Sequence, residues 1–399
     1  MHYDIAVIGA GASGMVASIL FARRGLKVLL IERQSRGGKK ILASGNGHCN
    51  IANIKVSKSN YYGKNSALID SLIKEYNLGD IVEFFRSIGL ELIVKDDGRV
   101  YPTSMQASIV LELLEYEIKR LNIKTIYDAK ELRVSNGFNI EINGAKFGSK
   151  KLILATGSMA APQLGGSSSG LEIAKSFGHS IITPLPALVS LNSKNLICKK
   201  ASGVKLNVKL KLFIEGKEAT SKIGDLLFTK YGVSGLSVLD ISIDIARVVR
   251  AKRNFYLEID FFRELSKKDF LEFLRDRVDK NRALPLNLWL GSIIHLKVAN
   301  HILEELNLIK KSERDLNLTT LKLLVDTLKA YRLDIESLRE FKYAEVALGG
   351  VDSKEIDLTM QSKRVKNLYF LGEVLDIIGD RGGYNFMFAW FSAFRVASS

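Results

Sequence analysis

The stretch DIAVIGAGASGMVASILFARRGLKVLLIE, residues 4–32, decides the fold of this chain. Its first five residues, Asp4–Ile8, form an apolar run that is too short for a helix, so we expect a buried parallel strand there. A glycine-rich turn follows, and Met15–Arg24 then has the apolar spacing of a helix. A second apolar strand is expected over Lys27–Ile31. This order of elements predicts an α/β domain that starts with a βαβ unit.

The turn, GAGASG, has the glycine spacing of a dinucleotide-binding loop. Its first glycine permits the tight turn, its second lets the backbone approach a pyrophosphate, and its third allows close packing of helix on strand. The helix N-terminus presents free N–H groups to the phosphates, and an acid 18 residues after the last glycine can bind ribose hydroxyls. An ordinary glycine-rich turn is the alternative. The expected cofactor-binding residues are Gly9, Gly11, Ala12, Ser13, Gly14, Glu32 and Arg33.

Length and composition limit the class of protein. The 399 residues, 47% of them hydrophobic, are enough for two or three domains with real cores. No run of about 18 apolar residues predicts a transmembrane helix, and no basic leader precedes the first strand. The two cysteines, Cys49 and Cys198, lack metal-ligand spacing and suggest no disulfide framework. We therefore expect a cytoplasmic protein that does not associate with membranes.

The formal charge of +15 favours a polyanionic partner such as RNA. Residues 191–340 contribute to it with 28 Lys and Arg against 20 Asp and Glu. A dense basic cluster, Arg247, Arg250, Lys252 and Arg253, lies in this segment and is suited to contact phosphates. A lysine-rich, solvated surface is an equally good explanation of the same charge.

Changes of pattern divide the chain. Residues 1–187 are expected to form the first part of the nucleotide-binding domain, which ends near Pro184 and Pro186. Residues 188–262 alternate apolar and polar side chains, which predicts antiparallel β structure, and 263–340 have helical spacing after a cap at Ser266. Residues 341–399 regain strand and glycine character and close with a helix over Phe386–Ala397. The first domain is therefore expected to be discontinuous, with the middle segment inserted.

A long polar loop over Arg33–Asn53 is expected to be functional, since loops of this length in compact domains usually are. This loop and several later motifs together resemble one family of bacterial flavoproteins. The family comprises NAD(P)/FAD-dependent oxidoreductases of the aminoacetone-oxidase type and includes ribosomal RNA dihydrouridine synthase-like members. The motifs that carry the resemblance run through the whole chain: Gly9–Gly14, Gly38–Lys40, Ser44–Asn50, Gly98–Pro102, Ala155–Gly157, Leu227–Thr229, Gly232–Gly235, Gly349–Val351, Gly372–Asp376 and Gly382–Asn385.

The resemblance implies a glutathione-reductase-type FAD-binding Rossmann domain that carries an inserted β-barrel and a helical subdomain. It also implies tightly bound FAD, while NADH or NADPH would bind only transiently, because the sequence has no second glycine-rich nucleotide motif. The chain departs from the family pattern at His48, Lys230 and Leu236, where Arg, His and Pro are common. The further residues expected to contact the flavin are Lys39, Lys40, Ser44, Gly45, Asn50, Ala155, Thr156, Gly157, Gly372, Glu373, Gly382, Gly383, Tyr384 and Asn385.

Two neighbouring residues are the catalytic candidates. A Cys49 thiol beside a flavin could protonate carbon after hydride transfer, but a free cysteine is often only a small buried side chain. His48 could act as an acid or contact phosphate, and an exposed loop histidine is the alternative. His295 and His301 are six residues apart and do not share a helical face, so no metal site is predicted.

These observations support three hypotheses. In the first, NAD(P)H-reduced FAD passes hydride to a C=C bond, with uridine in large-subunit ribosomal RNA as the expected substrate and dihydrouridine as the product. In the second, the chain is a flavin oxidoreductase of a small metabolite, such as an amine oxidase or an enoate reductase. In the third, it is a non-catalytic, FAD-containing binding protein of the ribosome. The sequence does not indicate an oligomeric state.

Overall fold

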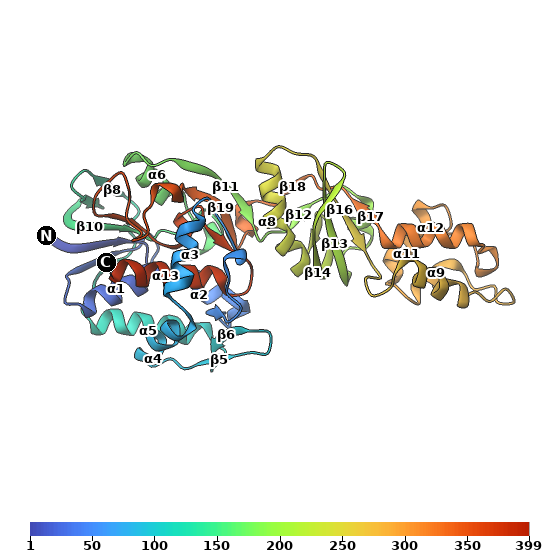
Figure 1. Ribbon diagram of the computed structural model, residues 1–399, viewed down its shortest axis with the longest axis horizontal. Coiled ribbons are helices and arrows are strands. Elements are labelled where there is room, and N and C mark those ends of the chain that lie inside the picture. Colours follow the sequence, from blue (N-terminus) through green and yellow to red (C-terminus); the bar gives the residue numbers. More distant parts are fainter. Residues whose placement is uncertain (399) are drawn as a thin grey trace. The chain divides into compact units, whose positions relative to one another are not determined.

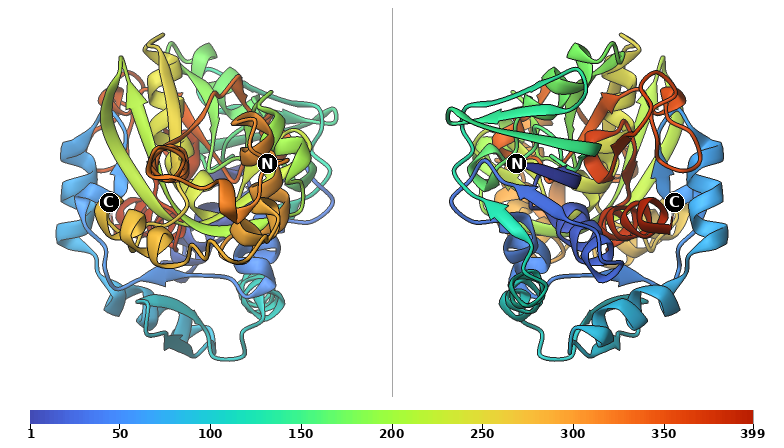
Figure 2. Two further views of the ribbon diagram at one scale, coloured as in Figure 1. Left: turned by 90° about the vertical axis from the view of Figure 1, so that its right-hand side faces the viewer. Right: turned by 90° about the vertical axis from the view of Figure 1, so that its left-hand side faces the viewer.

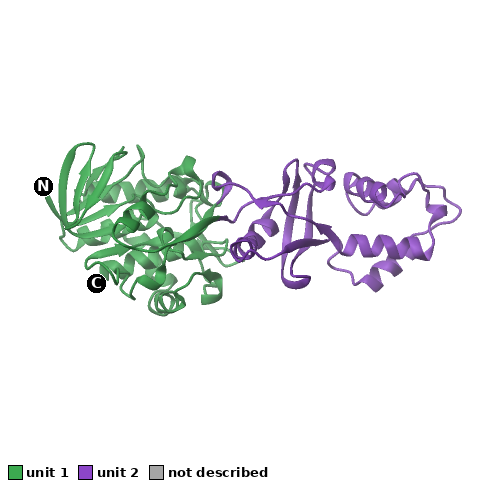
Figure 3. Ribbon diagram, turned by 90° about the horizontal axis from the view of Figure 1, so that it is seen from above, with its two compact units in different colours: residues 1–185, 345–399 green, residues 186–344 purple. Residues whose placement is uncertain are grey.

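The chain folds into two compact units (Figure 3). The first unit joins Met1–Leu185 to Glu345–Ser399, and the second is Pro186–Ala344. The structure is a computed structural model, and it describes residues 1–398. The first unit is therefore discontinuous in sequence, with the second inserted between its two parts.

A seven-stranded sheet forms the framework of the first unit (Figure 1). Parallel pairing runs β7–β2–β1–β10–β20, and β9 and β8 add an antiparallel edge to β10. The strands are β1 (His2–Ile8), β2 (Val28–Ile31), β7 (Lys124–Ile126), β8 (Leu132–Ser135), β9 (Asn139–Ile142), β10 (Ala145–Leu154) and β20 (Leu368–Phe370).

The order of these strands places β1 between β2 and β10. Ile8 pairs with Ile31 on one side and with Leu154 on the other, so the carboxyl ends of the three strands lie level. In parallel α/β sheets, ligands bind at this edge, where the strand order changes direction. The loops after β1, β2 and β10 therefore delimit the candidate site.

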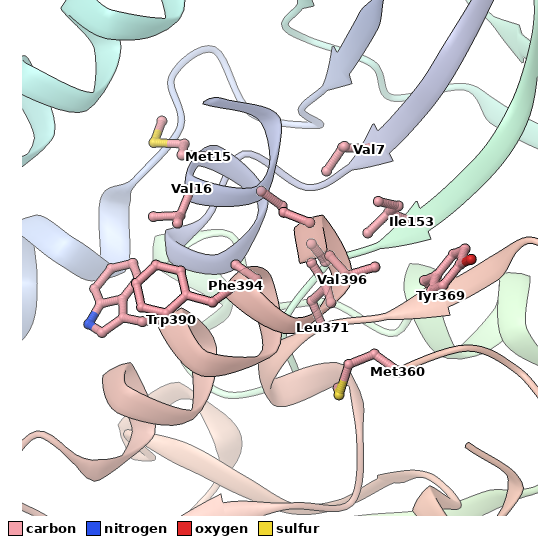
Figure 4. Packing of buried hydrophobic residues seen from close by; sticks show 14 of the residues in the cluster. Val7, Met15, Val16, Ile153, Met360, Tyr369, Leu371, Trp390, Phe394 and Val396 are labelled. Carbon is pink, nitrogen blue, oxygen red and sulfur yellow. The ribbon is translucent and has the colours of Figure 1, made fainter. Parts of the chain in front are cut away.

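Helices cover this sheet and complete its core. They are α1 (Ala12–Arg23), α2 (Lys39–Ala43), α3 (Ser66–Glu75), α4 (Leu78–Ser87), α5 (Ala107–Arg120), α6 (Ser169–Ser176) and α13 (Tyr384–Ser398). The last helix, α13, packs against α1 at the other end of the sequence, as the dark red and blue segments of Figure 2 show. Its Trp390, Phe394 and Val396 lie in the same buried cluster as Val16 (Figure 4).

Three small sheets complete the first unit. One contains β3 (Ala52–Asn53), β6 (Arg99–Pro102) and β5 (Leu92–Val94), and another pairs β21 (Ile378–Gly379) with β4 (Tyr61–Tyr62). The third pairs β11 (Ile181–Ala187) with β19 (Val346–Val351). Residues 33–53, expected to be one long loop, contain α2 and a 3₁₀ turn over Ser44–Gly47. Ile41 of α2 is buried, as are Cys49, Ile51 and Ala52, so apolar side chains anchor this largely polar segment to the core.

The second unit combines an antiparallel sheet with helices. Its pairing order is β17–β16–β13–β14–β15–β12–β18. The strands are β12 (Leu191–Asn192), β13 (Lys205–Ile214), β14 (Lys217–Thr229), β15 (Gly232–Ser234), β16 (Phe255–Asp260), β17 (Tyr331–Leu333) and β18 (Ser337–Leu338). The helices are α7 (Leu196–Lys200), α8 (Leu236–Arg250), α9 (Lys267–Asp276), α10 (Leu286–Gly291), α11 (Leu296–Glu305) and α12 (Leu318–Lys329).

Helix α8 differs from the β structure expected over residues 188–262. Val238, Ile241 and Ile245 are fully buried and lie three and four residues apart, which is helical rather than alternating spacing. The alternation of apolar and polar residues holds only for β13 and its hairpin and does not extend into α8. The expected cap of α9 is confirmed, because the Ser266 side chain accepts a hydrogen bond from the Asp269 N–H. Within the described residues no helix is long and apolar enough to cross a bilayer.

Glu117 joins α5 to α1 and makes the stability of the first unit dependent on pH. Its buried carboxylate accepts two hydrogen bonds from each of Arg120 and Arg23. The shorter bond is 2.7 Å from Arg120 and 2.8 Å from Arg23. The hydrogen bond from Arg120, with the further one from Arg23, outweighs the cost of burial and lowers the pKa of Glu117 to about 2. A lowered carboxyl pKa stabilises the fold above the unfolded value of 4.5, and this contribution is lost as the pH falls toward 2.

We predict that Glu117→Gln lowers the free energy of unfolding by about 1–2 kcal/mol at pH 7, because both arginines are partly hydrated. The difference from wild type should shrink between pH 4.5 and 3 in urea titrations followed by circular dichroism. Glu91→Gln is the control, since Glu91 pairs with Arg86 on the exposed surface. If the free energy of unfolding of Glu117→Gln stays below that of wild type by the same amount down to pH 3, the lowered pKa of Glu117 is contradicted.

Candidate functional site

Backbone contacts fix the turn between β1 and α1. Gly9 has φ +106°, and a Cβ there would lie 2.3 Å from the Ala155 carbonyl oxygen at the end of β10. A Cβ on Gly14 would lie 1.9 Å from the Gly9 carbonyl oxygen. These two glycines are therefore required by the packing of the protein itself.

Gly11 differs, because a Cβ there would meet no atom of the chain within 4 Å. Gly11 is also the N-cap of α1, and no side chain caps this helix. The helix starts at Ala12, three residues before the expected Met15, so its first N–H groups belong to the glycine loop. An open approach to uncapped N–H groups suits the phosphates of a dinucleotide.

The carboxylate of Glu32 lies against this turn. Its Oε2 accepts a hydrogen bond from the Ala10 N–H at 2.9 Å, and its Oε1 accepts one from the Gln34 N–H at 2.8 Å. Arg33 donates to the Gly165 carbonyl at 3.5 Å. The acid is thus held at the carboxyl end of β2, where its remaining lone pairs can accept ribose hydroxyls.

The segment before β3 lies against the start of α13, more than 300 residues later. Trp390 donates its indole N–H to the Ile51 carbonyl at 3.0 Å, and Asn53 donates to the Gly382 carbonyl at 3.0 Å. Gly383 has φ +102°, and a Cβ there would lie 2.6 Å from the Ala52 carbonyl oxygen. Beside it, the buried Oδ1 of Asn50 has no hydrogen-bond partner within the described residues. A buried acceptor without a donor is costly, so it fits a ligand that supplies an N–H or O–H.

Glu373 joins three further segments. Its Oε2 pairs with Lys40 Nζ at 2.9 Å, and its Oε1 accepts from the Ser158 hydroxyl at 2.8 Å and from the Ala347 N–H at 3.1 Å. Sequence reasoning predicted Lys40 and Glu373 separately but missed Ser158. The position of Ser158 directly after the predicted Thr156–Gly157 was the available signal.

The neighbouring Gly372 lies beside the first turn of α1. It has φ +63°, and a Cβ there would lie 3.1 Å from Ser13 Oγ. Its own N–H is hydrogen-bonded to Ser392 Oγ at 3.1 Å. Gly157, after β10, faces open space like Gly11, and a Cβ on either would meet nothing within 4 Å.

Several predicted residues are engaged within the chain. Lys39 donates to Gln34 at 2.9 Å, Ser44 donates to the Ile41 carbonyl at 2.7 Å, and Gly45 occupies a left-handed position in the 3₁₀ turn. Tyr384 is buried, and its carbonyl accepts from Tyr61.

Asn385, predicted to contact the flavin, also has partners within the chain. Its Oδ1 accepts from the Gly379 N–H at 2.7 Å, and its Nδ2 donates to the carbonyls of Gly379 and Asp380. Both ends of the amide are therefore used to hold the loop before α13. These bonds position the loop before α13, and a contact between Asn385 and the flavin stays a prediction.

The two catalytic candidates are adjacent but differ in environment. The Cys49 side chain is fully buried at φ +57°, and burial raises the pKa of its thiol to about 12 despite a hydrogen bond with Ser44. The thiol is therefore protonated at neutral pH, the form that a proton donor needs. His48 is exposed, and its Nδ1–H donates to the Met105 carbonyl at 2.7 Å. This bond leaves Nε2 as the free acceptor of the neutral ring.

The fold and the site together define a class. A Rossmann-type FAD-binding unit with an open glycine loop, carrying an inserted second unit, is the architecture of FAD-dependent oxidoreductases. Residues 3–399 match the HI0933-like protein Rossmann domain, and the chain belongs to this family.

The chain aligns with two relatives over nearly the whole length of each protein. The chain is 34% identical to the 3-dehydro-bile acid delta(4,6)-reductase of Clostridium scindens, covering 97% of this chain and 96% of the relative. It is 31% identical to the ribosomal RNA dihydrouridine synthase of Escherichia coli, covering 99% and 97%. Both relatives are oxidoreductases by name, and this chain is likewise an FAD-dependent oxidoreductase.

A solved structure shares the fold. The 3-ketosteroid-delta4-(5alpha)-dehydrogenase of Rhodococcus jostii matches with a TM-score of 0.50 at 14% identity, covering 100% of this chain and 97% of that one. At this identity the likeness concerns the architecture alone.

The contrast between two glycines gives a test of the nucleotide site. We predict that Gly11→Ala leaves the flavin-free protein folded, with a Tm within about 3 °C of wild type, because the added methyl meets no protein atom. Its FAD affinity should fall at least tenfold, which the absorbance near 450 nm of the purified protein would report. Gly14→Ala is the comparison and should prevent folding, since its methyl overlaps the Gly9 carbonyl. Stoichiometric flavin in Gly11→Ala would refute the assignment.

Proposed function

We propose that the adenosine half of FAD binds at the loop Gly9–Gly14. The uncapped N–H groups of α1 would hold the pyrophosphate and Glu32 the ribose hydroxyls. The open approach at Gly11 supports this assignment most strongly, because no atom of the chain explains the absence of a side chain there. Arg33, at the end of β2, would face the adenosine side of the cofactor.

The flavin half is assigned to the region where Asn50 meets the start of α13. The unpartnered Oδ1 of Asn50 would accept a hydrogen bond from the ring or the ribityl chain. The N-terminus of α13, opened by Gly382 and Gly383, would stabilise negative charge on the ring by about 0.3–2 kcal/mol. Glu373, which is held by Lys40 and Ser158, would accept ribityl hydroxyls.

Bound FAD would supply hydride transfer, from NADH or NADPH to an electron-poor C=C bond of the substrate. Addition across such a bond needs one hydride and one proton, on the two carbons respectively. The Cys49 Sγ–H is our candidate for the proton, since the thiol stays protonated below about pH 12. The free Nε2 of His48 would be the acceptor that orients a substrate N–H or hydroxyl.

Uridine in large-subunit ribosomal RNA is the substrate that we favour, and a ribosomal substrate would place the protein in the cytoplasm. The C5=C6 bond of uracil is conjugated to a carbonyl, as hydride addition requires. The net positive charge of +15, and the name of the Escherichia coli relative, support a polyanionic substrate. The base would have to leave its stack, which costs a few kcal/mol and is least costly in a single-stranded loop.

A small enone is the second candidate. The 34% identity to a reductase of a 3-dehydro bile acid supports it, because that substrate also carries C=C bonds conjugated to a carbonyl. The two candidates share their chemistry and differ in how the substrate is held. An amine oxidase would transfer hydride from the substrate to the flavin, the reverse of a reductase. Neither relative named above supports that reaction.

We predict that this chain restores dihydrouridine in an Escherichia coli strain that lacks its ribosomal RNA dihydrouridine synthase. Mapping of the ribosomal RNA by reverse transcription after borohydride treatment would measure it. In vitro, ribosomal RNA from the deletion strain should reoxidise NADH-reduced protein under anaerobic conditions. A 3-oxo-Δ4 bile acid tested in parallel separates the candidates, and reoxidation by the bile acid alone would exclude the RNA substrate.

Cys49 can be tested against the other buried cysteine. We predict that Cys49→Ala slows substrate reduction by about 10²–10⁴-fold while reduction of the protein by NADH is unchanged, because only the proton donor is lost. Since burial raises the pKa of this thiol to about 12, wild-type turnover should show no thiol ionisation between pH 6 and 9. Cys198→Ala, in α7, is the matched control and should behave as wild type. If Cys49→Ala is fully active, Cys49 is not the proton donor and only fills space in the core.

A further inference from the structure

Arg339, after β18 in the second unit, lies between two tyrosine rings. Its Cζ is 3.4 Å from the centroid of the Tyr343 ring and 3.8 Å from that of Tyr231. The two rings make no contact with one another among the described residues, so they lie on opposite faces of the guanidinium. Such stacking leaves the N–H groups at its edge directed outward between the rings.

The cluster is built from three separate segments. Tyr231 lies in the turn between β14 and β15, and Tyr343 ends a 3₁₀ turn over Phe341–Tyr343. The Arg339 N–H donates to the Ser190 carbonyl at 3.1 Å, which fixes the backbone from which the guanidinium projects. Both tyrosines are exposed, at 36% for Tyr231 and 45% for Tyr343. Each ring therefore has contact area available to a ligand.

The charge of this cluster is not neutralised. Within residues 1–398 no carboxylate lies within 4 Å of the Arg339 guanidinium, although the side chain is half-buried. The adjacent Lys230 is exposed and likewise forms no ion pair with a described residue. Arg332 provides the contrast in the same unit: it stacks on Tyr256 at 4.1 Å but is paired with Asp334 at 2.9 Å. An Arg held in place without an acid favours an anionic ligand.

The Tyr231 hydroxyl adds a donor to this surface. Burial alone would raise the pKa of Tyr231, but the nearby polar side chains of Ser190 and Thr229 and the positive charge of Arg339 lower it below its ordinary value. A more acidic phenol is a stronger hydrogen-bond donor toward an anionic oxygen.

We propose that Arg339, Tyr231 and Tyr343 form a binding site for single-stranded RNA in the second unit. The guanidinium edge takes a phosphate oxygen, and the outer faces of the tyrosines stack the neighbouring bases. Residues 191–340, with 28 basic and 20 acidic side chains, supply the long-range attraction that such a site needs. The inference rests on the proposed RNA substrate and names the residues that recognise it.

The test measures binding of a fluorescein-labelled twelve-nucleotide oligouridine to the FAD-loaded full chain, by anisotropy over a salt series and without reductant. Arg339→Gln should reduce the slope of log K against log salt by about 0.7, the value for one phosphate on a single strand. Tyr343→Ala should weaken binding about 5- to 100-fold through loss of stacking, and Tyr343→Phe should retain it. Arg332→Gln is the matched control and should leave slope and affinity unchanged, because Asp334 already neutralises that guanidinium.

Two results would overturn the assignment: an unchanged slope for Arg339→Gln, or equal losses for Arg339→Gln and Arg332→Gln. A third would redirect it. Calorimetry would measure the affinity of Arg339→Gln for a 3-oxo-Δ4 bile acid. If this affinity falls while oligouridine binding is unchanged, the cluster recognises a carboxylate and the RNA site is refuted. Thermal unfolding of each variant shows that it is folded. Since no turnover is measured, these outcomes do not depend on whether dihydrouridine is formed.

Discussion

The close approach of three backbone segments at the carboxyl end of β1 is the constraint on which the first unit depends. Gly9 touches the Ala155 carbonyl, and Gly14 touches Gly9 in turn, at distances that admit no side chain. This contact brings β10 and the start of α1 onto the same point of the sheet edge. Only when α1 begins there do its N–H groups face the opening at Gly11. The geometry of the proposed nucleotide site is therefore set by the packing of the protein itself.

The last helix closes the other half of the site by a second long-range contact. Trp390 and Asn53 fasten α13 to the segment that follows Cys49, and Gly383 allows the two backbones to meet. In this region the Cys49 side chain is fully buried, and the Oδ1 of Asn50 has no hydrogen-bond partner within the described residues. An unsatisfied buried acceptor is costly, so this atom fits a ligand that supplies an N–H or O–H. The core of α1 and α13 that surrounds this region thus holds the acceptor where such a ligand would meet it.

The sequence allowed the βαβ unit to be predicted because strand, glycine spacing, helix and acid are all local in sequence. The candidate Lys40–Glu373 pair was accessible only as two separate residues, since 333 positions separate them. Ser158 and the use of Asn385 within its own loop were not predictable, because both depend on partners fixed by tertiary packing. Helix α8 was missed for a local reason: its apolar residues follow a strongly alternating hairpin, and a single pattern was applied to both.

The residues that hold FAD cannot by themselves distinguish RNA from a steroid. Gly9–Gly14, Glu32 and Asn50 are proposed to face a cofactor that is common to both kinds of reductase, so their presence is equally consistent with either substrate. Discrimination must come from groups that meet the substrate beyond the reacting bond. An enone embedded in an apolar ring system would need an apolar lining, whereas a nucleotide needs cations and aromatic faces together. Arg339, stacked by two exposed tyrosines and paired with no described acid, supplies the second combination. It is therefore the feature on which the proposed preference for a nucleic acid rests.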